Sequence, residues 1–179
     1  MTPFVESFTT ILSIGIVLSN IATIIFIVSI FLRNNLFKVV SRHALTFSTI
    51  IALGAAFGSL FYSSVAGFVP CELCWWQRLF LFPQAVIFAI AWYRRWMYKI
   101  KSDEIFLYSL GLSIIGILIG LFHYYGTMFN PDILAACEVG GVSCAKQYFL
   151  MFGFINIPYM SLSAFALLGS IALIKTLDK

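Results

Sequence analysis

Two pairs of cysteines are the residues of this sequence with the clearest chemical potential. Cys71 and Cys74 have the CxxC spacing and lie in the stretch VPCELCWWQRLFLFP, whereas Cys137 and Cys144 are separated by six residues. The chain has four cysteines in all. Paired thiols can exchange electrons as dithiol and disulfide, bind a metal ion as thiolates, or form inert structural disulfides. The segments in which the four cysteines lie indicate which of these three roles is the best explanation.

Composition identifies the environment of these cysteines as a membrane. Of the 179 residues, 61% are hydrophobic and only 10% are charged, whereas about 25% are charged in a typical soluble domain. A helix needs about 20 apolar residues to cross a bilayer. We expect such helices at residues 11–32, 44–69, 75–93, 105–125 and 158–174. In lipid, backbone N–H and C=O groups have no water to bind, and a helix satisfies all of them within one segment. The sequence therefore predicts an all-α integral membrane protein.

Positive charges orient the five expected helices. Nine of the eleven Lys and Arg residues lie in the first gap, the third gap and the C-terminal tail: Arg33, Lys38, Arg42, Arg94, Arg95, Lys99, Lys101, Lys175 and Lys179. These segments share one side of the membrane, which the positive-inside rule assigns to the cytoplasm. The N-terminus is then outside and the C-terminus inside (N-out/C-in). Topology therefore explains the net charge of +4, and we expect no nucleic-acid binding.

Both cysteine pairs lie in gaps on the opposite side, because two spans separate them. Disulfides persist outside the bacterial cytoplasm. We therefore predict a multi-pass protein of the bacterial cytoplasmic (inner) membrane, with both pairs on its periplasmic or extracellular side. The wide spacing of the second pair disfavours a four-cysteine zinc site, and we expect no metal. A non-enzymatic membrane scaffold with two structural disulfides is a remaining alternative, although structural disulfides are more typical of small soluble domains.

The surroundings of the first pair favour thiol exchange. Pro70 disfavours helix just before Cys71, so Cys74 falls at the start of the next helix, where the helix dipole stabilises a thiolate. Arg78 follows at i+4 on the same helix face and supplies a cation. An ionisable residue inside a span usually has a function, although Arg78 could instead reach lipid phosphates. Gln77 is as readily a helix-packing residue as a functional one.

The second pair lies in a loop with acidic neighbours. Gly140-Gly141 permits a tight turn that brings Cys137 and Cys144 together. Closing so short a loop adds little stability, so exchange with a protein thiol is the better explanation of the pair. His123, near the outer end of the fourth span, is the only histidine on the side of the cysteines. A histidine there is often simply hydrogen-bonded at the interface.

Together these motifs resemble the bacterial disulfide bond formation protein B (DsbB) family, in its short-loop, BdbC-like branch. The matching pieces are CELCWWQR at 71–78, His123 fourteen residues before Cys137, the second cysteine pair, and IPYMSLSAF at 157–165. The resemblance implies a four-helix transmembrane bundle.

The first expected helix has no counterpart in that bundle. We therefore expect an extra N-terminal transmembrane helix and a basic cytoplasmic loop at 1–43, followed by a DsbB-like redox domain at 44–179. Nothing in the motifs assigns a role to the extra helix.

The resemblance implies a disulfide-generating thiol:quinone oxidoreductase. In the family the CxxC pair passes electrons to a membrane quinone (ubiquinone or menaquinone), with the residues matching Cys74 and Arg78 beside it. Gln77 and His123 are also expected near the quinone. The loop pair receives electrons from a DsbA-like or BdbD-like thioredoxin-fold protein, with Cys137 forming the mixed disulfide. A vitamin K epoxide reductase-like enzyme is the alternative, but there the quinone-facing CxxC lies late in the core.

Overall fold

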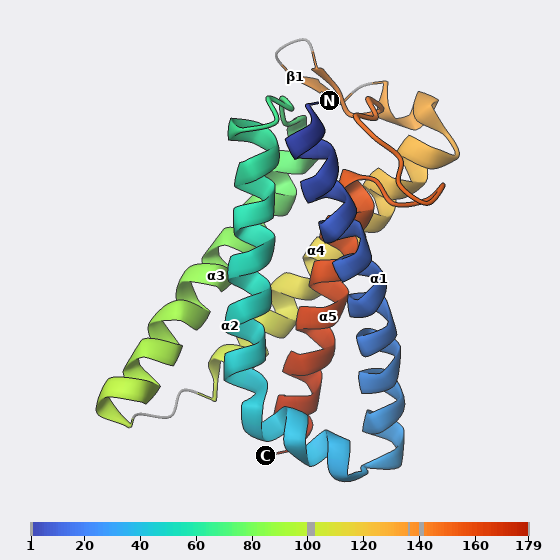
Figure 1. The fold of residues 1–179 in the computed structure, drawn as a ribbon. Helices are drawn as coiled ribbons and strands as arrows, with labels where there is room; N and C mark the ends of the chain where they lie inside the picture. The colour runs from blue at the N-terminus through green and yellow to red at the C-terminus, as the bar shows by residue number, and fades with distance from the viewer. Residues whose placement is uncertain (1, 100–102, 136, 140–141, 179) are drawn as a thin grey trace.

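The computed structural model describes residues 2–99, 103–135, 137–139 and 142–178, and it consists of five long helices with a small loop layer at one end (Figure 1). The helices are α1 (Pro3–Leu32), α2 (Asn35–Ser64), α3 (Glu72–Tyr98), α4 (Ile105–Met128) and α5 (Ile157–Leu177). All five are long and apolar enough to cross a membrane. The all-α, multi-pass membrane class predicted from the sequence is confirmed.

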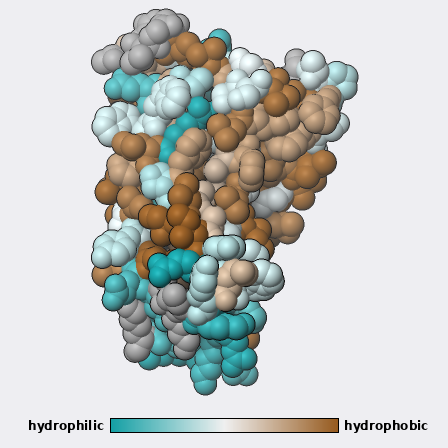
Figure 2. All heavy atoms as spheres, turned by 90° about the vertical axis from the view of Figure 1, so that its left-hand side faces the viewer, coloured by the Kyte–Doolittle hydropathy of each residue, from teal (hydrophilic) through white to brown (hydrophobic). Residues whose placement is uncertain are grey.

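The surface agrees with a membrane-crossing protein. Figure 2 shows hydrophobic side chains gathered across the middle of one face and hydrophilic ones at its lower end. Large apolar side chains such as Phe31, Leu79 and Ile90 are more than half exposed. Apolar patches of that extent are rare on soluble monomers, and here they face lipid.

Capping residues set the ends of several helices. The side chains of Thr2, Asn34 and Asn156 accept hydrogen bonds from backbone N–H groups in the first turns of α1, α2 and α5, which satisfies donors that have no partner within the helix. Pro3 and Pro158 occupy the first turns of α1 and α5, where a missing N–H costs nothing.

The start of α2 differs from the sequence-based expectation. The helix begins at Asn35 rather than at residue 44, so Lys38 and Arg42 lie within it and not in a loop. In Figure 1 its first turns run across the lower end of the bundle before the helix turns upward. Phe37 and Val40 are buried there while Lys38 is exposed. This segment is amphipathic, as expected for a helix at a membrane surface.

Helix α5 is the centre of the bundle. It packs against α1, α2 and α4, and its Phe165, Leu168 and Ile171 are fully buried. Gly116 of α4 lets the two helices approach, since a Cβ there would lie 2.5 Å from the Phe165 ring. Gly120 meets α5 one turn further on. The GxxxG pair of α4 is therefore a helix-packing contact.

Small polar residues attach α1 to the rest of the bundle. Besides Val5, the buried residues of α1 are Thr9, Ser13, Thr23 and Ser29, and small residues of this kind let membrane helices approach closely. Hydrogen bonds tie α1 at two heights. Tyr62 Oη of α2 donates to Thr9 Oγ1 at 3.3 Å, and Asn20 Nδ2 donates to an α5 tyrosine hydroxyl at 3.0 Å.

The connection between α4 and α5 forms a layer over the end of the bundle where the N-terminus lies (Figure 1). It contains a 3-10 helix, η1 (Pro131–Leu134), and the antiparallel strands β1 (Glu138–Val139) and β2 (Val142–Ser143). The expected tight turn at Gly140-Gly141 lies outside the described residues. The Cys144 N–H donates to the Cys137 carbonyl at 3.0 Å, so the strand pair holds these two cysteines side by side.

Candidate functional site

The CxxC pair lies where α3 begins. Cys71 is the N-cap residue, with extended backbone (φ −76°, ψ 177°), and Cys74 is in the first turn of the helix. Both are free thiols, and their sulfur atoms are 3.1 Å apart. A small rotation of the side chains would bring the two sulfurs into bonding distance. The local geometry therefore allows the pair to alternate between dithiol and disulfide.

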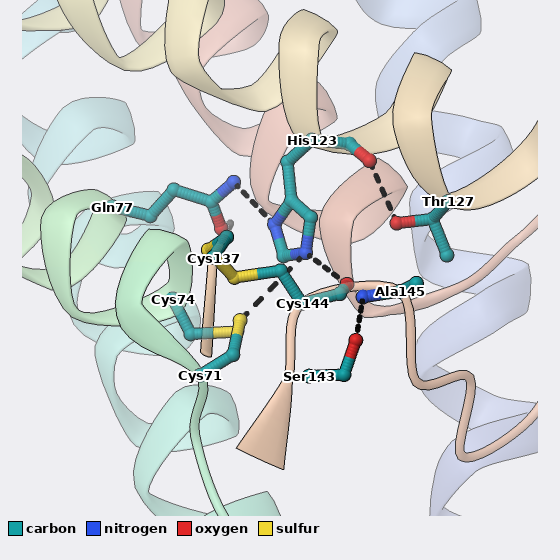
Figure 3. The surroundings of a disulfide bond; sticks show 9 residues. All are labelled: Cys71, Cys74, Gln77, His123, Thr127, Cys137, Ser143, Cys144 and Ala145. Atoms are coloured by element: carbon teal, nitrogen blue, oxygen red, sulfur yellow. Dashed lines mark hydrogen bonds between the residues drawn. A yellow bond between two sulfur atoms is a disulfide. The ribbon is translucent and has the colours of Figure 1, made fainter. Parts of the chain in front are cut away.

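The second pair lies directly against the first. Cys137 and Cys144 form a disulfide, and Cys144 is buried in one cluster with Cys71 and Leu134. Cys74 and Cys137 pack against the same cluster (Figure 3). The α4–α5 loop thus folds both pairs into one apolar pocket at the start of α3. Thiol exchange between the pairs needs no passage across the membrane.

His123 of α4 points toward both pairs (Figure 3). Its Nε2 is 3.1 Å from the Cys144 carbonyl oxygen and 3.8 Å from Cys71 Sγ, while its Nδ1 is 3.4 Å from Gln77 Nε2. A carbonyl can only accept a hydrogen bond, so Nε2 carries the proton, and Nδ1 of the neutral ring accepts from the Gln77 amide. Both side chains are almost fully buried. Gln77 therefore fixes the ring with its N–H directed at Cys71 and Cys144.

Hydrogen bonding favours the thiolate form of Cys71. The hydrogen bond with the Cys74 sulfur is the largest influence and lowers the pKa of the Cys71 thiol well below its usual range. The hydrogen bond from His123 lowers this pKa further, while burial opposes both. Because a thiol of low pKa is a good leaving group in disulfide exchange, Cys71 is suited to exchange with the neighbouring pair. Sequence reasoning placed the stabilised thiolate at Cys74, because the contact with His123 is invisible in local spacing.

Cys74 borders an apolar cavity between α1, α2, α3 and α5. The cavity has a volume of about 270 Å³, and Cys74, Gln77 and Arg78 line its polar end. Pockets that bind small molecules start at about 300 Å³, so the cavity is close to the smallest size that holds the ring of one small ligand. His123 is not one of the described residues that line the cavity. The structure therefore places His123 on the side of the loop pair rather than in the cavity.

Arg78 is held in place by α2. Its Nε donates to Ser59 Oγ and its Nη2 to the Ser59 carbonyl, both at 2.9 Å, and its guanidinium carbon lies 5.2 Å from the centre of the Trp75 ring. A guanidinium group has five N–H donors, so donors remain for a group in the cavity. Sequence reasoning found Arg78 but missed Ser59, because no local pattern reports a contact between separate helices.

The described residues do not form the four-cysteine metal site considered for the sequence, because only two of the cysteines are free thiols. Cys71, Cys74 and His123 bring their potential ligand atoms within 4.8 Å of one another. Cys137 and Cys144 are bonded to each other and are not available as ligands in this state. The arrangement of the four sulfurs is therefore that of two adjacent dithiol–disulfide pairs.

Comparison with known proteins gives consistent matches. The chain matches the family described as "Disulfide bond formation protein DsbB" over residues 41–175. It is 38% identical over 121 residues to disulfide bond formation protein C of Bacillus subtilis, which covers 68% of this chain and 83% of that protein.

Two further relatives carry similar names. The SPbeta prophage-derived disulfide bond formation protein B of Bacillus subtilis is 38% identical over 136 residues (74% of this chain, 87% of that protein). The probable disulfide formation protein C of Halalkalibacterium halodurans is 37% identical over 123 residues (68% and 84%). No solved structure gives a significant match. The family match begins within α2, so α1 lies outside it.

Proposed function

Because this chain belongs to the disulfide bond formation protein DsbB family, we propose that it is a thiol:quinone oxidoreductase that re-oxidises a DsbA-like thioredoxin-fold protein. The family expected from the sequence motifs is thereby confirmed, and the reaction is our proposal. One observation carries it: the CxxC pair lies between the loop disulfide and the apolar cavity. Cys71 belongs to the cluster around the loop pair, and Cys74 borders the cavity.

The first exchange joins the loop pair to the partner. Cys137 is partly exposed whereas Cys144 is buried, so a partner thiolate can reach Cys137 more easily. Its attack forms a mixed disulfide with Cys137 and breaks the Cys137–Cys144 bond, releasing the Cys144 thiolate. The second partner thiol then attacks the partner sulfur of the mixed disulfide. The partner leaves as a disulfide, and the loop pair holds two electrons and two protons.

The second exchange passes these electrons to the CxxC pair in its oxidised form. Cys144 packs next to Cys71, so its thiolate attacks the Cys71 sulfur and releases the Cys74 thiolate toward the cavity. Cys137 then attacks Cys144, which restores the loop disulfide and leaves Cys71 reduced. The His123 N–H faces the Cys71 sulfur, where it stabilises the departing thiolate.

The residues around the cavity fit a quinone. Arg78 has unused donors there, and Ser161 Oγ, a buried hydroxyl without a protein hydrogen-bond partner among the described residues, lies in its wall. When bound, ubiquinone or menaquinone would accept two electrons and two protons and leave as the quinol. Arg78 would hold a carbonyl oxygen of the ring and stabilise negative charge beside Cys74. The apolar walls exclude water from the reacting sulfur.

The proposed membrane orientation is N-out/C-in in the bacterial cytoplasmic membrane. The N-terminus and the cysteine loop lie at one end of the bundle, and the C-terminus lies at the other (Figure 1). The basic ends of α1, α3 and α5 share the end of the C-terminus, which supports cytoplasmic placement of that end. We also propose the division into an extra helix with its basic connection at 1–43 and a redox domain at 44–179.

Reconstitution tests the proposed reaction. The purified chain is placed in lipid nanodiscs with a reduced thioredoxin-fold dithiol protein and a quinone, and quinol formation is followed by absorbance. We expect one quinol for each partner disulfide formed, and loss of turnover in Cys71→Ser and Cys74→Ser. Cys137→Ser should stop reduction by the protein partner but leave some reduction by a small dithiol that reaches Cys71. If the chain with all four thiols intact reduces no quinone, the proposal is wrong and a static scaffold explains the cysteines better.

A further inference from the structure

We infer that α1, the helix outside the family match, forms a wall of the quinone cavity and binds the apolar tail of the quinone against α2. The inference rests on the proposed quinone function and deepens it. It assigns a role to the segment for which the sequence motifs gave none.

The first observation is the lining of the cavity. Leu12, Gly15, Ile16 and Ser19 of α1 border the same space as Cys74 and Arg78. The cavity is therefore closed on one side by a helix that the family match does not include. Without α1, its side between α2 and α5 would open directly to lipid.

The second observation is that α1 has a fixed position. Its hydrogen bonds at Thr9 and Asn20 lie above and below the segment that borders the cavity. The ring of Phe8 in α1 packs against that of Phe61 in α2, with ring centres 3.8 Å apart and the planes tilted by 33°. A wall held at both heights can shape a binding site, whereas a loosely associated helix could not.

The third observation is the shape of the space between α1 and α2. The two helices lie together at the upper end of the bundle and diverge toward the lower end (Figure 1). Near the point of contact, a Cβ on Gly58 would lie 3.7 Å from Leu12. One turn deeper, a Cβ on Gly54 or on Gly15 would have no atom within 4 Å. These two glycines leave a slot between the helices.

The polarity of the lining identifies the occupant. The charged and thiol groups gather at the end near Arg78, while Ile16, Ile50 and Ile51 line the deeper part. From Ser59, which holds Arg78, to Ile50 is nine residues of helix, or about 14 Å at 1.5 Å per residue. Ile50 is 64% exposed, so the slot reaches the lipid-facing surface. A polar redox head with a long aliphatic chain matches this gradient, and a water-soluble substrate does not.

Filling the slot with a side chain tests the inference. In Gly15→Leu and Gly54→Leu the new side chain enters the slot without meeting protein at its Cβ. Gly111→Leu is the matched control, because Gly111 is also an exposed helical glycine with no atom within 4 Å of a Cβ, and it does not line the cavity. All three variants are made in the full chain in nanodiscs.

Binding is measured directly, without turnover. Quenching of tryptophan fluorescence reports the quinone head, because Trp75 lies against Arg78. Two quinones with the same ring are compared, one with an isoprenoid tail and one without. We expect Gly15→Leu and Gly54→Leu to weaken binding of the tailed quinone at least tenfold, or about 1.4 kcal/mol, and to change binding of the tail-less one less than twofold. Gly111→Leu should change neither.

A second readout locates the tail on the chain. A quinone with a photoreactive group in its tail should label peptides of α1 and α2, and mass spectrometry identifies them. Equal weakening for both quinones, or labelling confined to α3 and α4, would overturn the inference while leaving the proposed function in place. If the wild-type chain binds and reduces neither quinone, the proposed function fails as well, so the two failures are distinguishable.

Discussion

Replacing His123 tests whether its imidazole controls the reactivity of Cys71. In His123→Phe a ring remains, but the N–H that lies 3.8 Å from Cys71 Sγ and 3.1 Å from the Cys144 carbonyl is lost. A hydrogen bond to a charged group contributes about 1.5–3 kcal/mol, and the long contact to sulfur places this one at the lower end. Since one pKa unit corresponds to about 1.36 kcal/mol, the pKa of Cys71 should rise by about one unit.

The assay is the pH dependence of Cys71 alkylation in the reduced protein. A Cys137→Ser/Cys144→Ser background removes the loop thiols, and mass spectrometry identifies the alkylated residue. The pKa of Cys71 is lowered in the folded protein, so its thiolate is present above that pKa and is lost as the pH falls. The midpoint of the profile should therefore move about one unit higher in His123→Phe.

The two profiles should cross. Below both midpoints the variant has about tenfold less thiolate, but a less acidic thiol is about threefold more nucleophilic at a Brønsted coefficient of about 0.4–0.5. The variant should thus react about threefold more slowly at low pH and about threefold faster above both midpoints. His123→Gln, which can keep an N–H donor near the Nε2 position, should shift the midpoint less. An unmoved midpoint in His123→Phe, or equal shifts in both variants, would refute the role of the N–H.

Two further predictions concern packing and the cavity. Gly116→Ala should lower the free energy of unfolding in detergent by about 1–3 kcal/mol, because its Cβ would lie 2.5 Å from the buried Phe165 ring. Gly111→Ala meets no atom within 4 Å and should not, so an equal loss in both would contradict this packing argument. Arg78→Lys keeps the charge but loses the fork that holds Ser59, and KM for quinone should rise about tenfold, or about 1.5 kcal/mol for one charge-assisted hydrogen bond. Ser59→Ala keeps the backbone acceptor and should raise KM less, and the reverse order would exclude this positioning.

The sequence predicted the number and class of the helices because a single physical requirement, an apolar run as long as the bilayer is thick, controls both. It predicted helix ends less well. The apolar run of α2 begins near residue 44, but the Asn34 cap starts the helix at Asn35. Capping is a local hydrogen-bond property that hydropathy does not report.

The candidate site, like the helices, was predicted from the sequence only in part. Residue types and spacing singled out the four cysteines and Arg78, because thiol chemistry and a cation near a helix start leave a local signature. The direction in which each sulfur faces depends on α4 and on the loop, which are distant in sequence. Two GxxxG pairs, Gly54/Gly58 in α2 and Gly116/Gly120 in α4, illustrate the limit. Gly116 packs against α5, whereas Gly54 lines the cavity.

The central position of α5 has a consequence for biosynthesis. This helix follows the other four in the chain, so it is made after them. Until it inserts, α1, α2 and α4 lack the partner that fills the space between them, and the cavity lacks the wall that contains Ser161. A nascent chain that stops before Ile157 already holds all four cysteines. Such a chain would hold its thiols without the complete cavity in which we propose that a quinone binds, so the proposed site can form only after α5 has been made.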